Sequence, residues 1–159
     1  MGMRTWTVNG FGVLAEELEN ATTDNRIAFL KDFLPKEYNR MMDDLESEEN
    51  IDPTNTADYI DFCKDWINNY EGENGDIQGI AGIFADAINT FSNGDVPVEC
   101  LIGDYSDENA VLYVPAYPWH MSKRVKHMSE NDMRLFFEKF LNKLGVSAKV
   151  DTYSVEFNG

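Results

Sequence analysis

The sequence predicts an α+β fold, with a mainly antiparallel sheet of about four strands and helices packed on one face of it, in a single domain. Residues 98–121 hold two short apolar segments joined by a polar turn, a pattern typical of an antiparallel strand pair. Residues 14–91 show the three- and four-residue apolar spacing of helices. One more helix and an alternating segment follow, so the order is strand, helices, hairpin, helix, strand.

The length and composition indicate one globular domain. The chain has 159 residues, 43% of them apolar and 13% aromatic, which favours a packed core over disorder. We expect the domain to span residues 3–159, with residues 1–2 as an expression scar. No segment resembles a secretion signal or a membrane span, and Cys63 and Cys100 suit buried, reduced thiols. We therefore expect a cytoplasmic protein.

The first elements are a strand and a short helix. Alternation over residues 4–8 favours a strand, and Asn9-Gly10 is a dipeptide typical of hairpin turns. The dipeptide either joins a hairpin whose second strand, residues 11–13, is very short, or only bends the chain into a helix at residues 14–19. Gly10 and Gly12 lack the third glycine of a dinucleotide-binding loop.

The middle of the chain predicts three longer helices and then an unusually apolar one. Pro35 either interrupts the first or begins the second. The third is expected to start near Asp52, with Thr54 or Thr56 as alternative caps, and to bury a broad apolar stripe. The fourth, about residues 77–91, carries almost no charge and is expected to lie centrally against the sheet.

The C-terminal part has the clearest boundaries. Ser129 and Asp132 have the spacing of a capping box, and Gly145 is a typical helix stop. Residues 146–150 and 153–157 each alternate, on opposite parities, which predicts two short strands or one strand with a bulge.

The C-terminal third resembles small uncharacterised proteins of Gram-positive gut bacteria and of their phages or mobile elements. The resemblance is carried by Val111-Leu-Tyr-Val-Pro-Ala-Tyr-Pro-Trp119, by Met128-Ser-Glu-Asn-Asp132 and by the ending Val155-Glu-Phe-Asn-Gly159. It implies a strand that runs into a Pro-Trp exit and then a helix. It implies no activity.

The charge of the chain is strongly uneven. The net charge is −16, and residues 35–110 carry 19 acidic and 3 basic residues, whereas residues 111–159 carry 5 acidic and 7 basic ones. An acidic middle repels phosphate, so direct binding of nucleic acid is disfavoured. A basic protein surface is the complementary partner.

No pattern of catalytic or metal-binding residues is present. His120 and His127 match no zinc spacing, and neither lies beside a serine in a nucleophile motif. The acidic loop at residues 104–115 lacks the glycine and the final glutamate of a calcium loop. The sequence therefore predicts no catalytic residue, no metal and no cofactor.

The favoured hypothesis is a non-enzymatic acidic interaction module. Carboxylates displayed on helices imitate a phosphate backbone and block basic channels, as a phage or mobile-element inhibitor would. An ordinary solvated face explains the same residues. The candidate partner-binding residues are Asp43, Asp44, Glu46, Glu48, Glu49, Asp58, Asp61 and Asp65.

Two further possibilities stay open. Tyr117, Trp119 and His120 form a second candidate surface, although we expect Trp119 to plug the open end of the core. The alternative function is a small enzyme or ligand-binding domain, with its pocket between the sheet and the helix at residues 77–91.

Overall fold

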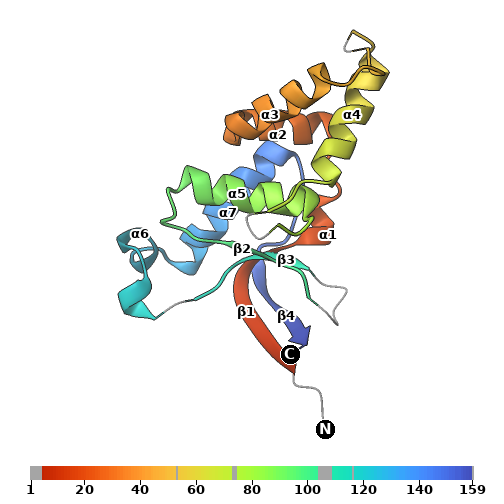
Figure 1. The fold of residues 1–159 in the computed structure, drawn as a ribbon. Coiled ribbons are helices and arrows are strands. Elements are labelled where there is room, and N and C mark those ends of the chain that lie inside the picture. The colour runs from red at the N-terminus through yellow and green to blue at the C-terminus, as the bar shows by residue number, and fades with distance from the viewer. Residues whose placement is uncertain (1–4, 53, 73–74, 104–108, 116, 159) are drawn as a thin grey trace.

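The computed structural model describes residues 5–52, 54–72, 75–103, 109–115 and 117–158. The strands are β1 Thr5–Leu14, β2 Glu99–Leu101, β3 Ala110–Tyr113 and β4 Asp151–Asn158. The helices are α1 Ala15–Leu18, α2 Thr23–Phe33, α3 Pro35–Glu46, α4 Thr56–Asn68, α5 Gly79–Phe91, α6 Lys123–Lys126 and α7 Glu130–Leu144, with a 3₁₀ turn η1 at Pro118–His120. The α+β prediction is confirmed (Figure 1).

The four strands form one antiparallel sheet in the order β2-β3-β1-β4. β1 is central: Phe11 pairs with Tyr113 on one side, and Thr5 pairs with Asn158 on the other. The hairpin predicted within residues 98–121 is the β2–β3 pair. Most of its predicted polar turn lies outside the described residues.

One face of the sheet is covered by helices, as predicted. α5 packs on β2 and β3, and α2 packs on both α5 and α7. Aromatic rings fill the space between these helices, with Phe84 stacked on Phe29 at 6.0 Å between ring centroids and edge-on to Phe140 at 6.3 Å. The central position expected for the helix at residues 77–91 is confirmed, because α5 is buried along most of its length.

The other face of the sheet holds a second, smaller apolar cluster. Ala110, Leu112 and Val155 are fully buried there although they belong only to strands. The partly buried side chains that pack around them also come from the strands and their ends: Leu14, Leu101, Val114, Tyr153 and Phe157.

The hairpin turn or bend predicted at Asn9-Gly10 is wrong, because both residues lie inside the continuous strand β1. A Cβ atom added at Gly12 would overlap the carbonyl oxygen of Val111, and one at Gly10 would lie 2.7 Å from that of Tyr113. Glycine is therefore needed at both positions because the backbone of β1 lies very close to that of β3, and not because the chain turns there.

The C-terminal helix begins and ends as predicted. The Ser129 hydroxyl accepts a hydrogen bond from the amide of Asp132, whose carboxylate accepts one from the amide of Ser129. Gly145 ends α7 with a φ of 76°. The strand predicted at residues 146–150 is wrong, since the amide of Lys149 donates to the Glu17 carboxylate instead of to a neighbouring strand.

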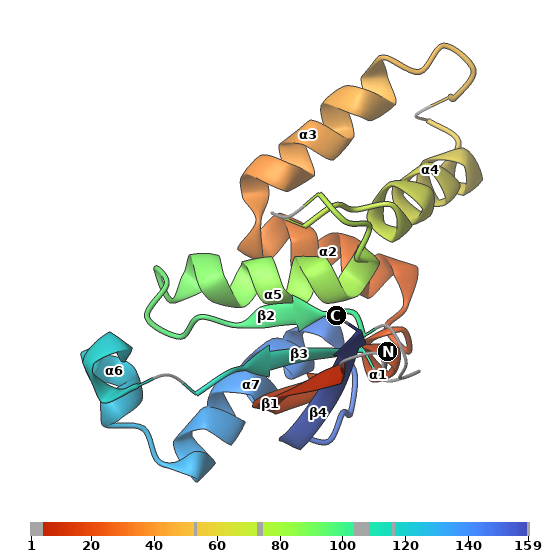
Figure 2. The same ribbon diagram turned by 60° about the horizontal axis from the view of Figure 1, so that its bottom comes forward.

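α3 and α4 form a helical hairpin that projects from the rest of the molecule. Figures 1 and 2 both show it reaching beyond α2 and α5 with the loop between α3 and α4 at its tip, and Figure 1 shows β1 and β4 at the opposite end of the molecule. None of the described helices combines the length and the apolarity needed to cross a bilayer.

Arg26 fixes the base of this hairpin to the body. Its buried guanidinium donates to the carbonyl oxygens of Ala21 and Glu19, at 3.1 and 2.7 Å. It also reaches Asn68, the last residue of α4, at 3.3 Å, and pairs with the Glu19 carboxylate at 3.2 Å. One side chain thus joins the turn before α2 to the end of α4.

Candidate functional site

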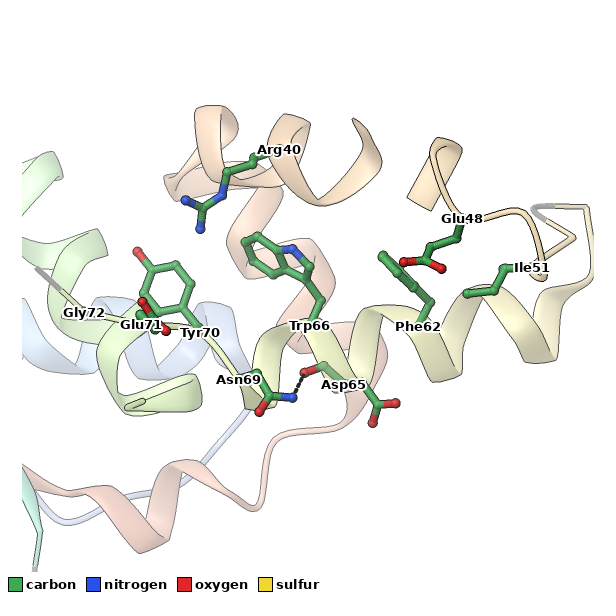
Figure 3. Close-up of a pocket in the computed structure, with 10 residues that line it drawn as sticks. All are labelled: Arg40, Glu48, Ile51, Phe62, Asp65, Trp66, Asn69, Tyr70, Glu71 and Gly72. Atoms are coloured by element: carbon green, nitrogen blue, oxygen red, sulfur yellow. Dashed lines mark hydrogen bonds between the residues drawn. The ribbon is translucent and has the colours of Figure 1, made fainter. Parts of the chain in front are cut away.

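A cleft lies between α3 and α4. Its volume is about 690 Å³, and Figure 3 shows the residues that line it. They are Arg40, Glu48, Ile51, Phe62, Asp65, Trp66, Asn69, Tyr70, Glu71 and Gly72. Aromatic rings and charged groups therefore share the same walls.

α3 presents one stripe of charged residues to this cleft. Pro35 is the first residue of the helix, which fits the fixed φ of proline at that position. Arg40 and Asp44 are four residues apart and so lie on one side of α3, and Glu48 follows in the loop after the helix ends at Glu46. Arg40 and Glu48 line the cleft, and Asp44 accepts a hydrogen bond from its tryptophan, Trp66.

α4 forms the other wall. The cap predicted at Asp52, Thr54 or Thr56 is wrong, because the helix begins at Thr56 and Asn55 caps it by accepting from the amides of Ala57 and Asp58. The apolar stripe of this helix divides in two. Cys63 and Ile67 are fully buried, whereas Phe62 and Trp66 are half-buried and face the cleft.

Trp66 is the centre of the cleft. Its Nε1 donates to the Asp44 carboxylate at 2.9 Å, which fixes the indole plane. The Arg40 guanidinium lies 5.2 Å from the ring centroid, within the range of a cation–π contact, and pairs with Glu37 at 2.7 Å. Figure 3 shows the indole rising from α4 towards α3, with Glu48 above Phe62 and Ile51.

A second depression continues from the cleft towards α5. Its volume is about 500 Å³, and it shares Tyr70, Glu71 and Gly72 with the cleft. The Tyr70 hydroxyl donates to the Asp86 carboxylate at 2.6 Å. Burial, and then this carboxylate, raise the pKa of Tyr70 above its ordinary value, so the phenol stays a donor at neutral pH.

The structure divides the eight predicted acidic residues into three groups. Glu48 and Asp65 line the cleft, and Asp44 holds its tryptophan. Five do not line the cleft: Asp43, Glu46, Glu49, Asp58 and Asp61. All five are exposed except Asp58, which is half-buried.

The tip of the hairpin is uniformly negative. Residues 41–63 contain eight acidic and no basic side chains. Arg40 lies just before this segment, and Lys64 just after it. The negative charge therefore increases from the base of the hairpin to its tip.

The second predicted surface lies at a different place. Tyr117 and Trp119 are 67% and 72% exposed, and their rings stack at 4.8 Å with an interplanar angle of 1°. His120 packs against Trp119 at 6.0 Å, so the three predicted residues are together. The expectation that Trp119 plugs the core is wrong, because η1 turns its ring outward.

The region between α5 and the sheet offers only small depressions. Two of about 240 Å³ lie along α5 and β2, and both are lined by Gln78 and Cys100. Small-molecule sites usually measure about 300–1,000 Å³. Burial, and then Asp86, raise the pKa of the Cys100 thiol to about 12, the opposite of what a nucleophile requires.

Sequence reasoning missed Arg40, Phe62, Trp66, Tyr70 and Glu71. Apolar spacing on α4 identifies Phe62 and Trp66 as one face, but the same spacing is produced whether that face is sealed or lines a cleft. Within the described part of the chain, no group of three or more histidine, cysteine or carboxylate side chains could hold a metal ion.

Comparison with protein-family models, with curated proteins and with solved structures finds no match to this chain.

Proposed function

We propose that the protein is a non-enzymatic interaction module, and that its acidic α3–α4 hairpin binds a basic surface of a partner protein. The observation that carries the proposal is the tip at residues 41–63, with eight acidic and no basic side chains on a projecting element. Charges of one sign on a projection raise the association rate with an oppositely charged surface.

The basic surface of the partner is one that ordinarily contacts nucleic acid. Regularly spaced carboxylates on helices present negative charge as a phosphate backbone does, so they compete for the same lysines and arginines. An inhibitor from a phage or mobile element would use such a surface, in line with the resemblance of the C-terminal third. The exposed Tyr117 and Trp119 supply a second contact region for the same partner.

The test compares two variants that each lose five negative charges. In the first, the five acidic residues outside the cleft are neutralised: D43N, E46Q, E49Q, D58N and D61N. In the control, five exposed acidic residues elsewhere are neutralised: D24N, D32N, D95N, E99Q and E156Q. Each tagged protein is used for affinity capture from a bacterial lysate, with elution by salt or by duplex DNA.

The expected result is a partner that the wild type and the control retain, that the hairpin variant loses, and that both salt and duplex DNA release. With the purified partner, the hairpin variant should associate about tenfold more slowly at low ionic strength. Equal retention by all three proteins would refute the hairpin as the binding surface. A partner lost only from Y117A/W119A would assign binding to the second surface instead.

A further inference from the structure

The cleft between α3 and α4 already holds one guanidinium group. Arg40 places its guanidinium over the Trp66 ring at 5.2 Å while Glu37 binds it at 2.7 Å. A tryptophan face together with a carboxylate is the combination that favours arginine, because the planar group stacks on the ring and forms directed hydrogen bonds at its edge.

The carboxylates of the cleft outnumber its cations. Glu48, Asp65 and Glu71 line it beside the single guanidinium of Arg40, which Glu37 already binds. Among the described residues, none of these three carboxylates forms an ion pair with a lysine or arginine. The cleft therefore has unused negative charge next to half-buried aromatic rings.

We propose that this cleft binds an arginine side chain of the basic partner. The guanidinium lies against the Trp66 and Phe62 rings and pairs with Glu48, whose carboxylate lies beside Phe62 in Figure 3. The proposal rests on the proposed function and names the chemistry that the hairpin recognises. Lysine is a poorer fit, because its ammonium is strongly hydrated and cannot stack.

The shape of the site favours a segment of polypeptide. The cleft is open to solvent and continues across Tyr70, Glu71 and Gly72 into the depression beside Asp86. An extended chain that places one arginine at Trp66 can run along this path, with Glu71 between the two depressions. Charge complementarity decides the occupant, because Glu48, Asp65 and Glu71 outnumber the one cation of the cleft and would repel an acidic segment.

The first experiment follows Trp66 itself. A W6F/W119F variant leaves Trp66 as the sole tryptophan. The probe is an acetylated and amidated glycine-rich octapeptide with two arginines, and the control peptide has citrulline in their place, which keeps the shape and removes the charge. We expect a saturable change in Trp66 fluorescence with the arginine peptide and none with the citrulline peptide. The same response to both peptides would overturn the proposal.

Substitutions at two neighbouring glutamates distinguish a specific contact in the cleft from general electrostatic attraction to the hairpin. Glu48 lines the cleft and Glu49 does not, although each substitution removes one charge. We expect E48Q to lower the affinity for the arginine peptide about threefold, as the loss of one ion pair would. E49Q should lower this affinity less than about 1.5-fold. Equal effects of E48Q and E49Q would show that binding depends on net charge and would exclude a defined pocket.

Removing Arg40 should strengthen binding. R40Q frees the ring face and the Glu37 carboxylate for the guanidinium of the peptide, whereas K36Q removes the same charge one helical turn earlier, outside the cleft. We expect the affinity to rise about threefold with R40Q and less than about 1.5-fold with K36Q. Equal gains would contradict the proposal.

The two proposals fail separately. If the hairpin variant D43N/E46Q/E49Q/D58N/D61N loses its partner while Trp66 does not respond to arginine, the acidic module stands and the arginine pocket is refuted. If Trp66 responds selectively to arginine while that variant keeps its partner, the pocket stands and long-range attraction by the tip is refuted.

Discussion

The sheet body and the α3–α4 hairpin use aromatic residues in opposite ways. In the body, Phe29, Phe84, Phe137 and Phe140 are fully buried and pack on one another between helices. In the hairpin, Phe62 and Trp66 are half-buried and line a cleft together with charged groups. The body gains stability from its rings, whereas the hairpin leaves part of each ring exposed to solvent.

The two regions also differ in the burial and in the hydrogen-bond partners of their arginines. Arg26 is buried at the base of the hairpin, where backbone carbonyls and a side-chain amide accept its hydrogen bonds. Arg40 lies on α3 with its guanidinium mostly exposed, bound by one carboxylate and one ring. The first arginine links two elements of the fold, whereas the second lies at the surface of the cleft.

The largest expected effect comes from the core of the body. F84A removes a ring that contacts Phe29, Phe137 and Phe140, so it should lower the free energy of unfolding by about 3–5 kcal/mol. L135A, at a residue that is 55% exposed, is the control and should cost less than about 0.5 kcal/mol. Urea denaturation measures both, and a similar small loss in each would contradict the assignment of Phe84 to the core.

The next largest effect concerns Arg26. R26M keeps an unbranched apolar stem but leaves the carbonyls of Ala21 and Glu19 without their donor, so we expect a loss of about 2 kcal/mol in the free energy of unfolding. R40M, in the exposed position, should cost less than about 1 kcal/mol. Equal losses in thermal unfolding would mean that Arg26 does not act as a structural link.

Alkaline pH should destabilise the body through Cys100. Because burial raises the pKa of this thiol from 9.0 to about 12, the unfolded chain loses its proton first as the pH rises. The stabilising contribution is therefore complete below about pH 9 and is lost between about pH 9 and 12, by about 1 kcal/mol per pH unit. Urea titrations at pH 8 and pH 10 should show this loss, and C100A should reduce it. An unchanged loss in C100A would assign it to other groups.

The smallest expected effect is at the cleft. D44N replaces the carboxylate that accepts from Trp66 with an amide that still accepts, so the free energy of unfolding should fall by about 0.5 kcal/mol. The Trp66 emission in the W6F/W119F background should shift more clearly than the stability does. A loss as large as that of F84A would show that the cleft belongs to the core.

Part of this structure follows from local sequence rules. The capping box at Ser129 and the stop at Gly145 depend on neighbouring residues, so α7 is correctly bounded from the sequence. The length of β1 is not correctly predicted, because Asn9-Gly10 has the composition of a turn. Only β3, which is distant in sequence, explains why glycine is required there. The extent of β1 therefore depends on contacts between residues that are far apart in the sequence.

The candidate site is also predictable only where local sequence patterns determine it. Acidic spacing on α3 and α4 identifies the charge of the hairpin, but it does not reveal that Asp44 is bound to Trp66 while Glu48 faces a cleft. The exposure of Trp119 was also unpredictable, since a tryptophan between apolar segments is usually buried and only the geometry of η1 turns it outward.

The pairing of β1 with β4 has a consequence for folding during synthesis. β1 is synthesised well before its partners, so Phe11 must wait for Tyr113, and Thr5 for Asn158. The helices from α2 to α5 can associate before that, whereas the sheet can close only after β4 has been synthesised. Contacts so distant in sequence make folding slow, and an early, unpaired β1 is the segment most in need of a chaperone.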